Sequence, residues 1–240
     1  MRTIRKRQEP KELTEWTAAN QAEPDVTGIN FDYDALRQND EAINAVLNAL
    51  LAEQGQLCAY TGRRISPAAA HIEHLLPQAL CERGYDVAYH NLIACWPAPN
   101  TPRCPYGAHA KDDWPSPEEM PQFVSPLSSG CGGRFHFNQR GEITHASDDD
   151  AAAKMTIAKL RLDHKSLTAM RQSDIDGVLG KTRTLSLKDA RTRLKSIEDA
   201  EAQLDSGAAI ALEPFCFALK QALQKYITAL ERIKKFGPKK

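Results

Sequence analysis

Residues 71–95 read HIEHLLPQALCERGYDVAYHNLIAC. This stretch places an acidic residue directly before a histidine and an Asn-Leu pair 17 positions later, and a second histidine close to a lysine follows it. Such side chains serve as general bases and metal ligands. In order along the chain, the candidate residues are Cys58, His71, Glu73, His74, Asn91, Cys95, Cys104, His109 and Lys111.

Each member of this set also has a plain structural interpretation. A single histidine on a short strand is more often structural than catalytic. Asn91 would suit the start of a helix at YHNLIAC, because asparagine caps helices well. Cys95 could be a small buried apolar residue. It is the joint occurrence in this order that favours a functional site.

Three regions surround this set, and together they predict an α+β fold that is mainly helical. Residues 1–55 read as an arm with a short helix near 12–19, followed by a longer helix over 39–55. Asn39 can cap that longer helix and Gly55 can end it. Residues 147–240 are expected to be helical, with a helix end at His164.

The middle region, 56–146, holds most of the proline, glycine, cysteine and histidine. CAYTGRRI predicts a strand pair around a Thr-Gly turn, HIEH a strand, and RFHFNQRGEIT a hairpin turning at 138–141. Because its apolar periodicity is weak, a bound metal would be one source of stability.

The composition is that of an ordinary globular chain with no net charge, 31 basic residues balancing 31 acidic ones. Basic residues crowd both ends, where they are expected to be solvated or to contact a partner, with phosphate binding as the alternative. No apolar run suggests a signal peptide or a membrane span, so we expect a cytoplasmic protein. Six cysteines in that compartment suggest metal before disulfides.

The segments LCAYTGRRI, HIEHLLPQ, YHNLIAC, CPYGAHAKDDW and TIAKLRLDH resemble the HNH endonuclease subunit of the Septu and retron-associated anti-phage defence systems. The opening MRTIRKRQEPKELTEW also fits, so the resemblance covers roughly residues 1–175. It implies a small ββα-metal (HNH) core within 56–146. On either side the resemblance implies an N-terminal arm and helix, over 1–55, and a helical region for partner docking, over 147–240.

By motif position, the resemblance implies that His74 is the general base and Glu73 a ligand of a divalent metal (Mg, Mn or Zn). It further implies that Asn91 holds the catalytic loop or orients His74, that His109 is a second metal ligand, and that Lys111 lies near the phosphate.

Two points stay open. Neighbouring residues of a regular strand point to opposite faces, so Glu73 and His74 can share one metal only if the strand bends. The alternative metal pair is His71 with Glu73, which lie on one face. In addition, Asn100 competes with Asn91 for the middle position of the motif.

The resemblance also implies a structural zinc, held by Cys58, Cys95 and Cys104. The first cysteine pair is incomplete, since Thr61 stands where a second cysteine would be. Because zinc takes four ligands, Cys81, Cys131 or His136 would have to supply the last.

The implied function is metal-dependent cleavage of DNA, with an ABC or SMC-like ATPase as regulatory partner. RNA cleavage would use the same phosphodiester chemistry. A different class of function is a nucleic-acid-binding or assembly module that keeps the fold without catalysis.

Overall fold

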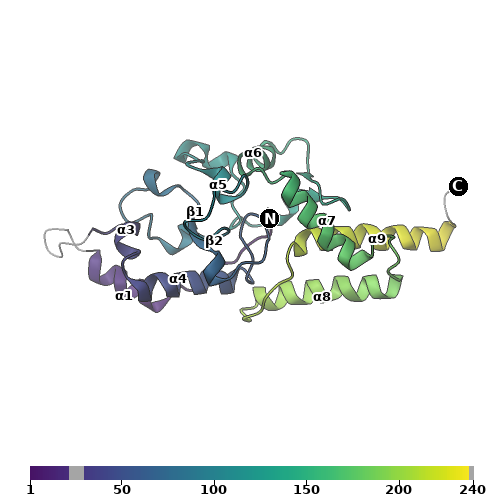
Figure 1. The fold of residues 1–240 in the computed structure, drawn as a ribbon, viewed down its shortest axis with the longest axis horizontal. Coiled ribbons are helices and arrows are strands. Elements are labelled where there is room, and N and C mark those ends of the chain that lie inside the picture. The colour runs from purple at the N-terminus through teal and green to yellow at the C-terminus, as the bar shows by residue number, and fades with distance from the viewer. Residues whose placement is uncertain (22–29, 238–240) are drawn as a thin grey trace.

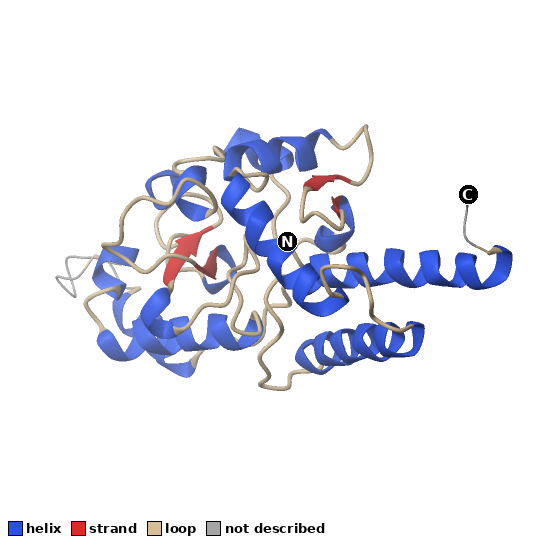
Figure 2. Ribbon diagram, turned by 45° about the vertical axis from the view of Figure 1, so that its right-hand side comes forward, coloured by secondary structure: helices blue, strands red, loops and turns tan. Residues whose placement is uncertain are grey.

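Helices predominate in the computed structural model, which describes residues 1–21 and 30–237 and contains two small antiparallel sheets. The expected α+β, mainly helical class is therefore confirmed at this coarse level. Figure 2 shows the two sheets as separate pairs of short strands among the helices. Short 3-10 turns link the longer elements: η1 (Pro67–Ala69), η2 (Gln78–Leu80), η3 (Tyr89–Asn91), η4 (Pro117–Gln122) and η5 (Cys131–Arg134).

The N-terminal helices are α1 (Lys11–Asn20), α3 (Tyr33–Leu36) and α4 (Asp40–Glu53). The predicted cap of α4 is confirmed, because the Asn39 side chain accepts from the Ala42 amide at 2.9 Å. Gly55 follows with φ of +63°. A Cβ at this position would lie 2.7 Å from Leu212 Cγ, so both the backbone angle and the close approach require glycine.

The first sheet pairs β1 (His71–His74) with β2 (Leu92–Cys95), with His71 opposite Cys95 and His74 opposite Leu92. Helix α4 packs against β2 through the buried side chain of Gln54. Its amide donates to the carbonyls of Leu57 and Ala94 and accepts from the Ala94 amide, each at 2.8 Å. Gln54 thus completes hydrogen bonds that a third strand would otherwise supply.

Residues 58–65 do not form the expected strand pair, because the antiparallel pairing is limited to a single bridge between Leu57 and Arg64. The turn itself is present, since the Gly62 amide donates to the Cys58 carbonyl at 2.9 Å. The aromatic ring of Phe217 packs where a Gly62 Cβ would lie, at 2.4 Å. Packing against the C-terminal region therefore replaces further strand pairing.

The predicted hairpin is confirmed as β3 (Phe135–Phe137) and β4 (Ile143–His145), with Gly141 in the turn at φ of +75°. It docks on the last helix and not on the first sheet. Gln221 accepts from the Phe137 amide at 2.7 Å and donates to the Phe135 carbonyl at 2.9 Å.

The remaining helices are α5 (Ala108–Lys111), α6 (Ala151–Leu160), α7 (Lys165–Leu179), α8 (Leu187–Asp205) and α9 (Cys216–Phe236). Helices α8 and α9 lie side by side and extend beyond the rest of the molecule (Figure 1). His164 begins α7, where we expected it to end a helix. Its Nδ1 accepts from the Ser166 amide at 3.2 Å, so it is an N-cap.

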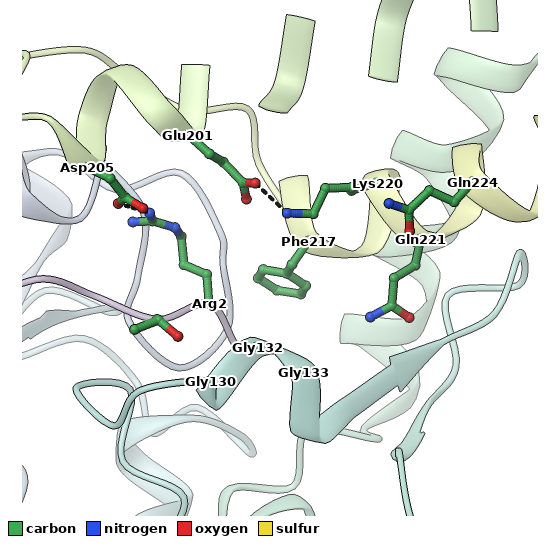
Figure 3. Close-up of a pocket in the computed structure, with 11 residues that line it drawn as sticks. Arg2, Gly130, Gly132, Gly133, Glu201, Asp205, Phe217, Lys220, Gln221 and Gln224 are labelled. Carbon is green, nitrogen blue, oxygen red and sulfur yellow. Dashed lines mark hydrogen bonds and ion pairs between the residues drawn. The ribbon is translucent and has the colours of Figure 1, made fainter. Parts of the chain in front are cut away.

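The N-terminal arm runs through the junction between the first sheet and the helical region. Arg2 pairs with Asp205 of α8 at 2.8 Å, and Arg7 donates to the Leu204 carbonyl at 3.0 Å. Figure 3 shows the pocket at this junction, where Arg2–Asp205 and Lys220–Glu201 form two ion pairs across it. Arg2 thus has an acidic partner within the chain, and Arg7 has a backbone carbonyl.

One cluster of buried apolar side chains extends from Met1 to Ile227, so all three sequence regions contribute to a common core. Within the described part of the chain, no helix combines the length and the apolar character needed to cross a membrane.

Candidate functional site

One face of β1 meets the short helix α5. Glu73 Oε1 lies 3.1 Å from Lys111 Nζ, and Glu73 Oε2 lies 3.5 Å from His71 Nε2. The imidazole rings of His71 and His109 stack with their centroids 5.9 Å apart. Four of the predicted site residues therefore lie together, two from the strand and two from the helix.

Burial makes these charges interact strongly. The side chains of His71 and Glu73 are each 17% exposed, and that of Lys111 is 1% exposed. Burial alone would raise the pKa of Glu73, but the Lys111 charge and the His71 hydrogen bond outweigh it and lower this pKa. Burial would lower the pKa of His71, but Glu73 outweighs it and raises this pKa. The Glu73 carboxylate is accordingly ionised.

Hydrogen bonds determine which ring nitrogen each histidine offers. His71 Nδ1 lies 2.5 Å from the Pro97 carbonyl, which can only accept, so its Nδ1 carries a proton and Nε2 faces Glu73. His109 Nδ1 accepts from the Cys104 amide at 2.9 Å. Neutral His109 therefore carries its proton on Nε2, which then has no lone pair for a metal. Of the two imidazoles, His71 has the Nε2 that faces the Glu73 carboxylate, so it would pair with Glu73 on a metal after giving up the proton with which it hydrogen-bonds Glu73.

His74 points to the opposite face of β1, as strand alternation requires. Its Nε2 lies 2.9 Å from the Asp86 carbonyl, and its ring meets the edge of Tyr33 at a centroid distance of 4.5 Å. Because Nε2 donates to that carbonyl, Nδ1 holds the lone pair. Burial lowers the pKa of His74, which keeps the imidazole neutral. A neutral imidazole with a free lone pair is the form that a general base needs.

Asn91 is buried and holds the segment that follows β1. Its Oδ1 accepts from the Leu76 amide at 2.9 Å, and its Nδ2 lies 3.2 Å from the Leu76 carbonyl and 3.4 Å from that of Tyr85. It contacts the loop and makes no hydrogen bond to His74 among the described residues. Asn100, the competing candidate, is exposed in the loop after β2.

Tyr33 and Asp86 were not among the sequence candidates. The Asp86 carboxylate accepts from the Tyr33 amide at 2.7 Å, which fixes α3 over the His74 ring. Nothing in the spacing of FDYDAL or GYDV points to this contact, because it joins residues 53 positions apart.

Of the predicted zinc ligands, Cys58 and Cys95, the last residue of β2, lie within hydrogen-bonding distance of each other. Burial would raise the pKa of Cys58, but hydrogen bonds from Cys95, Thr61 and the Trp96 amide outweigh it and lower the pKa to about 5. Cys104 is hydrogen-bonded to Tyr106.

The three candidates for a fourth zinc ligand have other neighbours. Cys81 donates to the Leu76 carbonyl at 3.4 Å. Burial raises the pKa of the Cys131 thiol, and the positive charge of the N-terminus opposes this shift. His136 Nε2 lies 2.5 Å from Lys225 Nζ. Across residues 1–21 and 30–237, no three His, Cys, Asp or Glu side chains are grouped so as to hold a metal. The structure thus brings two of the predicted thiols together.

Comparisons with known proteins add no assignment: no family model and no curated protein matches this chain.

Proposed function

We propose that the protein is a metal-dependent nuclease of the HNH type that hydrolyses DNA phosphodiester bonds, with β1, β2 and α5 as its ββα-metal core. The observation that carries the proposal is the convergence of His71, Glu73, His109 and Lys111 from β1 and α5. An ionised carboxylate, two imidazoles and a buried cation in one place are groups that metal-dependent phosphodiester hydrolysis uses.

The residues fit a divalent metal that has few protein ligands. Glu73 offers carboxylate oxygens and His71 offers Nε2, and magnesium in particular is often bound by one or two carboxylates together with water and substrate phosphate. Mg, Mn and Zn all accept this pair. When bound, such an ion would stabilise the charge that develops on the leaving oxygen.

The remaining groups act on the substrate. In this proposal His74 Nδ1 accepts the proton of an attacking water at the end of β1, since its side chain and that of Glu73 leave opposite faces of the strand, and the Asp86 carbonyl keeps the opposite nitrogen protonated. Asn91 holds the loop that carries Asp86. Lys111 attracts the phosphate, and His109 donates from Nε2 to a phosphate oxygen.

The helical region, 147–240, is proposed to dock an ABC or SMC-like ATPase that regulates cleavage. Its last helix ends in two exposed apolar side chains, Ile233 at 49% and Phe236 at 73%, which a partner could cover. We further propose that the protein works in the cytoplasm, where its cysteines stay reduced; all six are free thiols.

A second candidate function is a non-catalytic nucleic-acid-binding or assembly module. The observation that favours it is the Glu73–Lys111 ion pair, which occupies the carboxylate that a metal would need.

Plasmid cleavage tests these two candidates. Purified protein is incubated with Mg or Mn, alone and with the ATPase partner, and compared with His74→Ala, Glu73→Gln and the control His145→Ala on the hairpin. The proposal expects metal-dependent cleavage that is lost, by 100-fold or more, in the first two variants and kept in the control. Equal cleavage by His74→Ala would overturn the assignment of the base. No cleavage under any condition would favour the binding module.

A further inference from the structure

Arg63 is held between two aromatic side chains, Trp96 and Tyr106. Its guanidinium Cζ lies 3.8 Å from the centroid of the Trp96 ring, and its Nη1 donates to Tyr106 Oη at 2.8 Å. No carboxylate pairs with it in the part of the chain that the structure describes. The side chain is half-buried and held in one geometry by two aromatic residues.

Both of these aromatic residues belong to the segments that carry the candidate site. Trp96 follows Cys95, the residue paired with His71, and Tyr106 precedes α5 by two positions. Their rings stack at 6.0 Å with an interplanar angle of 19°. The position of Arg63 is thus tied to the same strand and helix as His71 and His109.

A guanidinium held in this way is suited to an anion. Arginine has five N–H donors in a planar fork that matches phosphate, and a single one of them is used by Tyr106. Its side-chain freedom is already restricted by the aromatic contacts, so binding costs less conformational entropy than at a mobile arginine. With no carboxylate to neutralise it, the charge remains available.

Positive charge continues beyond Tyr106, whose ring lies 5.3 Å from that of His164. The Gly107 amide donates to the Leu160 carbonyl at 2.8 Å, so the end of α6 borders the start of α5. Here Lys159, Arg161 and Lys165 are exposed, and none of the three forms an ion pair with another described residue.

We propose that Arg63 is a phosphate clamp, which binds a backbone phosphate of a nucleic-acid strand beside the candidate active site. Lys159, Arg161 and Lys165, at the α6–α7 junction, then form a basic track that binds further phosphates of the same strand. The choice of a nucleic acid as the polyanion that Arg63 binds rests on the proposed nuclease function. It adds a substrate-positioning residue that the motif residues do not include.

Binding measured without cleavage tests the clamp. Fluorescence anisotropy with a short labelled duplex, in EDTA, compares wild type with Arg63→Gln over a series of salt concentrations. Arg140→Gln is the matched control, because Arg140 is an exposed arginine paired with Glu142 on the hairpin. We expect Kd to rise by about fivefold or more in Arg63→Gln, and the slope of log Kd against log salt to fall by about one.

Arg63→Lys keeps the charge but loses the fork, so it should retain the salt slope with weaker binding. Thermal unfolding followed by circular dichroism checks that each variant is folded. Unchanged Kd and slope in folded Arg63→Gln, an equal loss in Arg140→Gln, or no binding by wild type would each overturn the clamp.

The two proposals can fail separately. If wild type cleaves plasmid and Arg63→Gln binds as wild type does, the nuclease stands and the clamp is wrong. If wild type binds in an Arg63-dependent way but never cleaves, the clamp stands and the nuclease is wrong. If the basic track captures an acidic protein in place of the duplex, the clamp is wrong.

Discussion

Strand alternation is the residue-level fact that organises this site. His71 and Glu73 face α5, whereas His74 faces Tyr33 and Asp86. The sequence alone was enough to pose this problem, because adjacent strand residues cannot share a face. The sequence could not show which side chains of β1 face α5, since that depends on which face of the sheet residues 104–111 pack against.

The Glu73–Lys111 pair gives a stability prediction that is independent of catalysis. Glu73→Gln leaves the buried Lys111 ammonium without its carboxylate, so the free energy of unfolding should fall by about 3 kcal/mol. Adding Lys111→Met should recover most of that loss, because the second change removes the unpaired charge. Urea unfolding of the four proteins in this double-mutant cycle measures the coupling. Additive losses from the two changes would show that the ion pair contributes nothing.

At the scale of elements, local signals predicted what local interactions determine. The Asn39 cap, the Gly55 helix end and the hairpin around 138–141 depend on neighbouring residues, and each was predicted correctly. The strand pair expected after Cys58 and the helix end expected at His164 were wrong. At Gly62 the Phe217 ring, from a distant segment, packs against the turn, whereas at His164 the side chain caps the start of α7 through the Ser166 amide.

Gln54 is the element-scale position where one change should be most damaging. It joins α4 to β2 through three buried hydrogen bonds to backbone groups. Gln54→Leu leaves those groups without partners, and we expect a loss of about 2–4 kcal/mol in the free energy of unfolding. Gln38→Leu, at an exposed position, should change it by less than about 0.5 kcal/mol. Chemical denaturation of both variants makes the comparison, and equal stability would show that water replaces Gln54.

The whole molecule differs most from its sequence-level description at the N-terminal arm. Arg2, Lys6 and Arg7 were expected at a solvated end or against a partner, and each contacts an acceptor within the chain. Those acceptors lie on α4 and α8, so the prediction would have required the tertiary arrangement. The three regions were visible in the composition, but the common core that joins them was not.

The arm also gives a pH prediction. Burial lowers the pKa of Lys6 to about 8, with Glu53 opposing the shift, whereas an unfolded lysine titrates near 10.4. Between these values the unfolded chain binds more protons, so stability contributed by this position rises with pH. The unfolding free energy of wild type relative to Lys6→Met should therefore increase by about 2 kcal/mol from pH 8 to pH 10. A flat or falling difference in thermal denaturation across that range would contradict the depressed pKa.

The contact between the arm and α8 has a consequence for synthesis in the cell. Arg2 and Asp205 are 203 positions apart, and the ribosome adds residues from the N-terminus onward. At translation rates of 5–20 residues per second, roughly 10 to 40 seconds separate the appearance of these two partners. During that interval the segment with the candidate catalytic residues is synthesised, whereas the contact between the N-terminal arm and α8 cannot yet form. A nascent chain therefore forms the contact between the arm and α8 only after Asp205 has left the ribosome.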